Sequence, residues 1–241
     1  MKCNTLRLAV LAIGLVSFGA AAQRGLAVPT VFFDRDDNTG FPYMASYANS
    51  LAKFNDFTST LNSFGVDDIE IAAGSNPPLS FGATGITAQT QGVLAQFTGG
   101  AFSIGNQALL ESDAAGSSQV NTMFTFNQYI TAFGAYVIQG GDGANNNPTT
   151  FRLRNTITNT VVDDVVQQIG PSWGDGNIFF LGVHDTVPFD QVEIIESTDV
   201  ADGMLYDNIV VGNPVPEPGS LVLMMLGGAC ALCRRTGFRR S

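Results

Sequence analysis

Cysteine and histidine, which supply many metal ligands and catalytic nucleophiles, are almost missing from this sequence. The three cysteines, Cys3, Cys230 and Cys233, all lie near the ends, so the chain between them can form no disulfide. The only histidine is His184, so the sequence offers few residues from which a catalytic triad could be built. We therefore expect a protein that is not an enzyme and that has no resident cofactor.

Basic residues are also scarce once the two ends are set aside. Between Gln23 and Glu217 there are five lysines and arginines against all twenty-one acidic residues, a net charge of −16. Such a surface repels nucleic acid and anionic lipid but attracts divalent cations. We expect no nucleic-acid partner. Removing the two end segments leaves about 190 residues, Gln23 to Asn213, a length that suits one domain.

The first twenty-two residues have the order of a secretory signal peptide. Lys2 and Arg7 precede an apolar run from Leu8 to Phe18, which is followed by small residues up to Ala22. The run is shorter than the roughly 20 residues that span a bilayer. We predict cleavage after Ala22, with a second candidate site after Ala27, and a permanent N-terminal membrane anchor is the alternative.

The C-terminal segment has a three-part pattern of its own. Val215-Pro-Glu-Pro218 is followed by fifteen mostly apolar residues, Gly219 to Cys233, and then by an arginine-rich end. The two prolines prevent a helix and hold Glu217 in extended backbone. Because arginines favour the cytoplasmic side of a membrane, this segment would anchor the protein with its main domain outside.

This pattern resembles the PEP-CTERM sorting signal of exported bacterial proteins. The resemblance implies recognition by exosortase, a membrane-embedded processing enzyme of bacteria that make exopolysaccharide. It assigns the sorting motif to Pro216, Glu217 and Pro218 and the stop signal to Arg234 and Arg235. The alternative from the residues alone is a simple C-terminal membrane tail.

Hydrophobic periodicity divides the intervening domain into one helix followed by strands. An apolar stripe that begins at Met44 predicts a helix over about 43–57. From about residue 68 onward, short apolar or alternating runs are separated by Gly, Asn, Asp and Pro. We predict a mainly β domain over 23–213, a jelly-roll-like β-sandwich, and a membrane segment over 214–241. The predicted strands are 68–72, 79–82, 93–97, 123–126, 130–138, 151–154, 161–169, 178–183, 191–196 and 206–211.

Two groups of residues are candidates for ligand contact. Alternating oxygens at Asp34, Asp36 and Asn38 could bind Ca²⁺, although solvated turn residues are the simpler interpretation. Trp173, the only tryptophan, lies in a Gly-Asp-Gly segment and is a candidate for stacking on a sugar, or equally a core residue. Tyr136 and Tyr206 are candidates to assist it.

We therefore expect an exported cell-surface or extracellular-matrix protein that is held briefly at the inner membrane by its tail. Its β-sandwich would be a structural or carbohydrate-contacting module, and its partners would be exosortase and exopolysaccharide or other matrix components. The alternative is a secreted hydrolase that acts on polysaccharide with an Asp/Glu pair.

Overall fold

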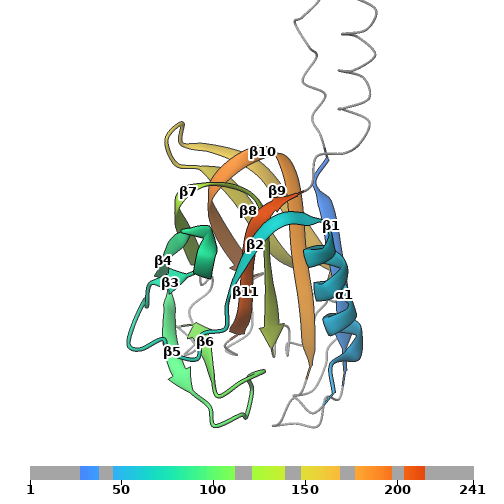
Figure 1. Ribbon diagram of the computed structural model, residues 1–241, viewed down its shortest axis with the longest axis vertical. Coiled ribbons are helices and arrows are strands. Elements are labelled where there is room, and N and C mark those ends of the chain that lie inside the picture. The colour runs from blue at the N-terminus through green and yellow to red at the C-terminus, as the bar shows by residue number, and fades with distance from the viewer. Residues whose placement is uncertain are drawn as a thin grey trace, which may run out of the picture.

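The computed structural model describes residues 28–37, 46–111, 121–138, 148–168, 177–196 and 204–214. Within these ranges the chain forms eleven strands, one α-helix and one short 3-10 turn (Figure 1). The elements are β1 (Thr30–Asp36), α1 (Ala48–Ser59), β2 (Leu61–Asp67), β3 (Leu79–Ser80), η1 (Gly82–Thr84), β4 (Thr87–Gln91), β5 (Val93–Phe97), β6 (Gln107–Glu111), β7 (Asn121–Ile138), β8 (Pro148–Asn155), β9 (Thr160–Gln168), β10 (Ile178–Glu196) and β11 (Leu205–Pro214).

Two long strands, β7 and β10, belong to both layers of the molecule. The first half of β10 pairs with β1 and with the second half of β7, and its second half pairs with β8 and with the first half of β7. The ladder between β7 and β10 is interrupted between His184 and Gln191, where both strands arch over one end of the fold (Figure 1). All the pairings are antiparallel.

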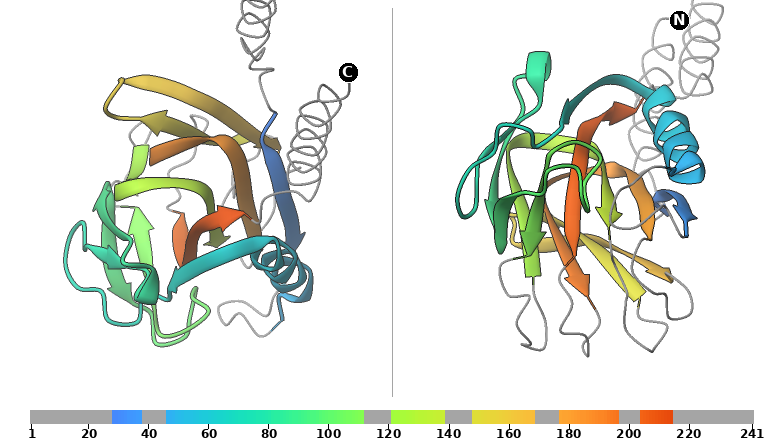
Figure 2. Two further views of the ribbon diagram at one scale, coloured as in Figure 1. Left: turned by 45° about the horizontal axis from the view of Figure 1, so that its top comes forward. Right: turned by 90° about the horizontal axis from the view of Figure 1, so that it is seen from below.

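The arching strands turn one hydrogen-bonded network into two packed sheets. The first sheet has the order β1-β10-β7-β11, with β2 and β6 both paired to β11 and β5 paired to β6. The second sheet has the order β9-β8-β10-β7-β4-β3. The two views in Figure 2 show these layers facing each other. This is the β-sandwich that the sequence predicts.

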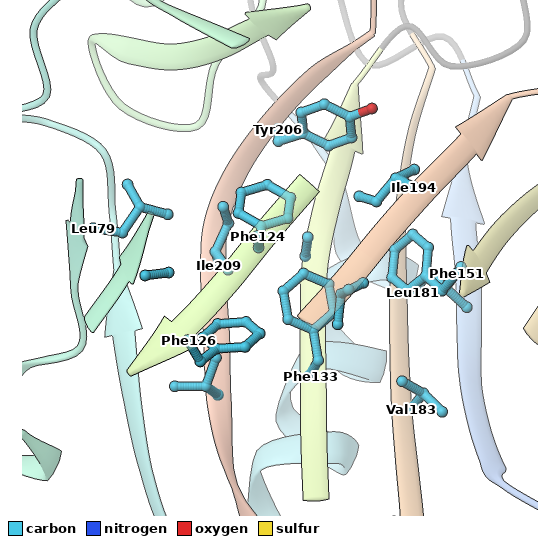
Figure 3. Close-up of a cluster of buried hydrophobic side chains, with 14 of the residues drawn as sticks. Leu79, Phe124, Phe126, Phe133, Phe151, Leu181, Val183, Ile194, Tyr206 and Ile209 are labelled. Carbon is cyan, nitrogen blue, oxygen red and sulfur yellow. The ribbon is translucent and has the colours of Figure 1, made fainter. Parts of the chain in front are cut away.

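The core between the sheets follows from the two-residue period of the strands. Phe133, Ala135 and Val137 of β7 alternate with residues of the opposite face and enter the buried cluster between the sheets. There the Phe133 ring contacts the rings of Phe124 and Phe151 (Figure 3). The Tyr206 ring contacts Phe124 edge-on. Packed aromatic rings of this kind bury a large apolar area, which explains how the domain holds together without disulfides.

Helix α1 covers the outer face of the first sheet. Phe57 is fully buried there and contacts Phe32 and Phe180 edge-on or tilted, with ring centroids 5.3 and 5.5 Å apart. The ring lies over Gly134 and Gly182, which are paired directly across β7 and β10. Two adjacent residues without side chains leave the space that the ring fills.

Several sequence predictions require correction. The helix begins at Ala48 and ends at Ser59, and a strand, β1, precedes it, so that strands do not start only near residue 68. The apolar stripe continues past the helix into β2, where Leu61 and Phe64 are strand residues. Residues 68–72 form a turn, in which Ile69 is buried at a positive φ of 63°.

Among the described residues, no helix combines the length and the apolar character needed to cross a bilayer. The predicted signal peptide over 1–22 and the predicted membrane segment after residue 214 lie outside the described residues.

Candidate functional site

Most residues predicted to take part in sorting or in ligand contact lie outside the described residues. These are Pro216, Glu217, Pro218, Arg234 and Arg235 of the sorting signal, together with Trp173 and Asn38. What the structure does place is the strand from which the sorting segment continues. Pro214, the last residue of β11, pairs with Leu61 at the start of β2.

The prediction that Tyr136 and Tyr206 contact a sugar is wrong, because both side chains are buried. Tyr136 is 1% exposed and stacks on Phe54 beneath helix α1, and this burial raises the pKa of its phenol. Tyr206 is 0% exposed and donates its hydroxyl hydrogen to Glu111 Oε1 at 2.5 Å. Both lie on strands whose two faces are covered, which the sequence alone does not reveal.

Asp36 has a structural role at the N-terminus of helix α1. Its Oδ1 accepts from the backbone N–H of Asn49 at 3.0 Å, and its Oδ2 accepts from that of Ser50 at 2.8 Å. A carboxylate at this position satisfies free amides and complements the helix dipole. Asp34 accepts from the N–H of Arg35 next to it. Within the described part of the chain, no group of three His, Cys, Asp or Glu side chains is arranged to hold a metal. Calcium binding stays a prediction.

Asp207, on β11, is a buried carboxylate with a strongly raised pKa. It is 1% exposed, and burial raises its pKa to about 7. Its oxygens accept from the backbone N–H groups of Ile104 and Asn208, both at 2.7 Å. Glu70 lies close enough to raise this pKa further, and its own carboxylate accepts from Asn106. Asp207 therefore fastens the segment after β5 to the sheet and is closed off from any substrate.

Two further features bear on catalysis. Ser172 lies in a Gly-x-Ser-x-Gly sequence, Gly170 to Gly174, the pattern that surrounds the serine of a nucleophile elbow. This segment lies outside the described residues. His184 contacts the Phe32 and Phe57 rings, and its Nε2 lies 3.1 Å from Thr60 Oγ1. Burial lowers its pKa to about 4, so it is neutral at pH 7.

The outer face of the second sheet carries a group of polar side chains, which we call the polar face. Arg152 makes two parallel hydrogen bonds to Asp164, at 2.8 and 3.0 Å. Glu193 lies between Arg152 and Arg154, 3.8 and 3.4 Å from their guanidinium nitrogens. The remaining members are Gln191 and Thr125, joined by a side-chain hydrogen bond of 2.9 Å.

The β-ladders explain why these residues share one face. Glu193 is directly opposite Arg152, and Arg152 is directly opposite Asp164. Their strand neighbours Phe151, Leu153, Val192 and Ile194 are fully buried in the core, so the polar residues must point the other way. The alternation in residues 151–154 and 191–195 was the sequence signal that could have predicted this face.

An exposed aromatic ring borders the polar face. Tyr129 of β7 is 42% exposed, and its hydroxyl donates to Asn155 Oδ1 at 3.3 Å. Since β10 lies between β7 and β8 in the sheet, this bond carries the Tyr129 side chain across β10. A flat array of amide, guanidinium and carboxylate groups beside an aromatic ring can hydrogen-bond and stack on a sugar.

Residues 214–240 match the PEP-CTERM protein-sorting motif. The chain thus carries a PEP-CTERM sorting motif, as the sequence predicts, and this motif begins at the last residue of β11. No curated protein matches the chain.

Among solved structures, the chain is similar to variants of a family 29 carbohydrate-binding module, CBM29-2. One has a TM-score of 0.35 at 15% identity and covers 63% of this chain and 94% of that chain. Another, in complex with cellulohexaose, has a TM-score of 0.37 at 15% identity and covers 63% and 92%. The CBM22-1 xylan-binding domain from Paenibacillus barcinonensis Xyn10C has a TM-score of 0.34 at 12% identity and covers 62% and 94%. Likenesses at these TM-scores support no inference about what this chain binds.

Proposed function

The chain carries a PEP-CTERM sorting motif, and we propose that it is an exosortase substrate of the cell surface or extracellular matrix. Its C-terminal segment holds it at the inner membrane, processing occurs at Pro216-Glu-Pro218, and the β-sandwich is then passed to the cell surface or the exopolysaccharide. In this proposal the sandwich acts as a structural or carbohydrate-contacting module and performs no catalysis.

The observation that carries this proposal is that the folded domain ends where the sorting motif begins. β11 ends at Pro214, and the motif covers 214–240. The fold therefore needs none of the residues that processing would remove. Each of the other ten strands ends before residue 197, so cleavage at the Pro-Glu-Pro strip would release a finished sandwich.

The polar face and Tyr129 support contact with carbohydrate. A polysaccharide chain is extended, and a flat sheet face offers successive hydrogen-bonding groups along it. The Arg152–Asp164 and Arg154–Glu193 pairs hold their side chains in place before a ligand arrives, which lowers the entropic cost of binding. Asp207, whose raised pKa would suit a general acid, is buried under the backbone of Ile104 and is closed to a polysaccharide.

Substitution of the Pro-Glu-Pro strip tests the sorting proposal. A chain with Pro216, Glu217 and Pro218 all replaced by alanine should remain unprocessed in the membrane fraction of an exosortase-containing host. The matched control replaces Ile71 and Ser75, in the exposed loop after β2, by alanine and should be processed normally. Release of the first variant at the wild-type rate would remove the sorting proposal.

Binding to purified exopolysaccharide tests the carbohydrate proposal separately. Tyr129→Ala and Arg154→Ala should each weaken binding by about tenfold. Each substitution removes one stacking contact or one charged hydrogen bond, which contributes about 1.5 kcal/mol. The control is Phe97→Ala, an exposed aromatic residue on β5, outside the polar face. Equal loss in the control, or release of reducing sugar by the wild type, would contradict the proposal.

A further inference from the structure

The end of the sandwich from which the sorting segment continues can be defined from the β-ladders. Thr30, His184, Ala132, Gly212 and Phe64 form one row of paired residues across β1, β10, β7, β11 and β2. Side-chain hydrogen bonds attach the rest of this end to that row or to the β10 arch. These hydrogen bonds join three pairs of side chains: Thr60 and His184, Thr131 and Asn213, and Thr156 and Asp190. We call residues 28–31, 60–64, 127–131, 155–161, 184–190 and 211–214 the tether end; Figure 1 shows β7 and β10 arching over it.

The tether end has no exposed charge, in a domain that is otherwise strongly acidic. The only residues in it that can carry a charge near neutral pH are His184, Asp185 and Asp190. Asp185 and Asp190 are 4% and 7% exposed. Asp190 accepts from both the N–H and the hydroxyl of Thr156, and Asp185 accepts from the N–H of Val187. His184 is neutral at pH 7 because burial lowers its pKa. Two charged residues border this end: the Arg154 guanidinium donates to Asn159 at 3.5 Å, and Asp163 lies close enough to Asp185 to raise the pKa of that carboxyl.

Apolar side chains take the place of charge at this end. Among the described residues, seven of the twelve large apolar side chains that are exposed belong to the tether end. Ile157, at the turn between β8 and β9, is 78% exposed, and Val187, in the arch of β10, is 45% exposed. Val28, just before β1, is 87% exposed. An exposed apolar patch without charge typically marks an interaction surface.

The length of chain between the fold and the apolar segment limits how far the sandwich can stand from the membrane. Pro214 is paired in the sheet, and the apolar segment starts at Gly219. Five fully extended residues span at most about 18 Å. The headgroup layer on one side of a bilayer takes up about 5–8 Å of this. While the protein is held by its tail, the tether end must therefore lie close to the headgroups.

We propose that the tether end is a membrane-facing surface that rests on the lipid headgroups, with Val28, Ile157 and Val187 dipping into the interface, while the protein awaits processing. An acidic surface in this position would be repelled by anionic lipids. The uncharged end allows close approach and keeps the Pro-Glu-Pro strip within reach of a membrane-embedded enzyme. The polar face lies on the outer face of the second sheet and stays free for other contacts. Tyr129, at the boundary of the two surfaces, becomes available to carbohydrate once the tail is removed. This inference rests on the proposed anchoring by the C-terminal segment.

Fluorescence quenching in the full-length chain tests the proposal. Cys3, Cys230 and Cys233 are replaced by serine, and a single cysteine is introduced by Ile157→Cys or Val187→Cys and labelled with an environment-sensitive dye. The protein is reconstituted into vesicles of phosphatidylethanolamine and phosphatidylglycerol that carry a nitroxide at the headgroup or the upper acyl chain. The control label is at Ile71→Cys, which is 95% exposed in the turn after β2 and lies outside the tether end.

The labels at the tether end should be quenched at least threefold more strongly than the label at Ile71. Ile157→Glu should reduce the quenching of the Val187 label by half or more, whereas Ile71→Glu should not change it. Equal quenching at all three positions overturns the inference. So does quenching that develops only after exosortase is added, because that result would make the enzyme the partner. Failure of the chain to sediment with vesicles would instead contradict the anchoring on which the proposal rests.

Discussion

Gly182→Ala is the substitution that should test the packing of helix α1 most sharply. An alanine Cβ at this position would lie 2.8 Å from Phe57 Cδ2 and 2.9 Å from Phe180 Cε1. Ordinary van der Waals contacts begin near 3.4 Å. Both rings are fully buried, so neither can move into solvent without leaving its place in the core.

Two estimates bracket the cost. If the rings shift slightly and remain buried, the overpacking should cost about 1–3 kcal/mol. If Phe57 is expelled and the helix separates from the sheet, the loss should approach the roughly 3–5 kcal/mol of a Phe→Ala change. We therefore expect Gly182→Ala to lower the free energy of unfolding by about 2–4 kcal/mol.

Urea unfolding followed by circular dichroism measures this cost, with Phe57→Ala as the second arm of a double-mutant cycle. Alanine lacks the Cγ and Cδ2 atoms that the new Cβ would meet and leaves Phe180 space to shift, so Gly182→Ala should cost less than about 1 kcal/mol in that background. A cost below about 0.5 kcal/mol in the wild type, or the same cost in both backgrounds, would refute the packing of Phe57 on the glycine pair.

Three other predictions concern the helix start, the histidine and the acidic segment after β1. Asp36→Ala leaves the N–H groups of Asn49 and Ser50 without their acceptor and should cost about 1 kcal/mol in urea unfolding, with less loss in Asp36→Asn; no change in either would show that the cap is unimportant. Since the folded-state pKa of His184 is lowered to about 4, the unfolded state takes up a proton first as pH falls. The difference in stability between the wild type and His184→Gln should shift against the wild type from about pH 6.5 to about pH 4, and a constant difference would contradict the buried neutral ring. Millimolar Ca²⁺ should raise the melting temperature by a few degrees if residues 34–38 bind it, and an unchanged melting temperature would contradict that prediction.

The strands of the second half were predictable because their alternation is clear, but their continuity was not. β7 and β10 were each predicted as two strands, with breaks at residues 127–129 and 184–190. Asn127-Gln128 and Asp185 to Pro188 look like turns in sequence. In the structure these residues are the arches by which one strand passes from the first sheet to the second, a tertiary feature that local propensity does not encode.

Three strands, β1, β2 and β4, were not predicted because their residues lack a clear alternation of apolar and polar side chains or suggest another structure. β1 contains Asp34 and Asp36, which suggested an acidic loop. In the structure both residues are part of a strand, and the Asp36 carboxylate caps helix α1. β2 continues the apolar stripe of the helix without a break in sequence. β4 is Thr-Ala-Gln-Thr-Gln, and only the burial of Ala88 and Thr90 marks its inner face.

The candidate site was predictable only in part. The sorting motif could be read from residue order, because recognition of an exposed peptide depends on local sequence. The exposure of an aromatic ring depends instead on which strands flank it, and for this reason Tyr136 and Tyr206 were chosen although both are buried, while Tyr129 was overlooked. The polar face required the register of β8, β9 and β10, which no single stretch of sequence supplies.

Mass spectrometry of the native protein, recovered from the cell surface and from the medium of the source bacterium, tests the central claim most directly. We expect a C-terminus at or near Pro216-Glu-Pro218, with the apolar segment and the arginine-rich end removed. Protein that is freely dissolved in the medium and still carries Arg239 and Arg240 would contradict it.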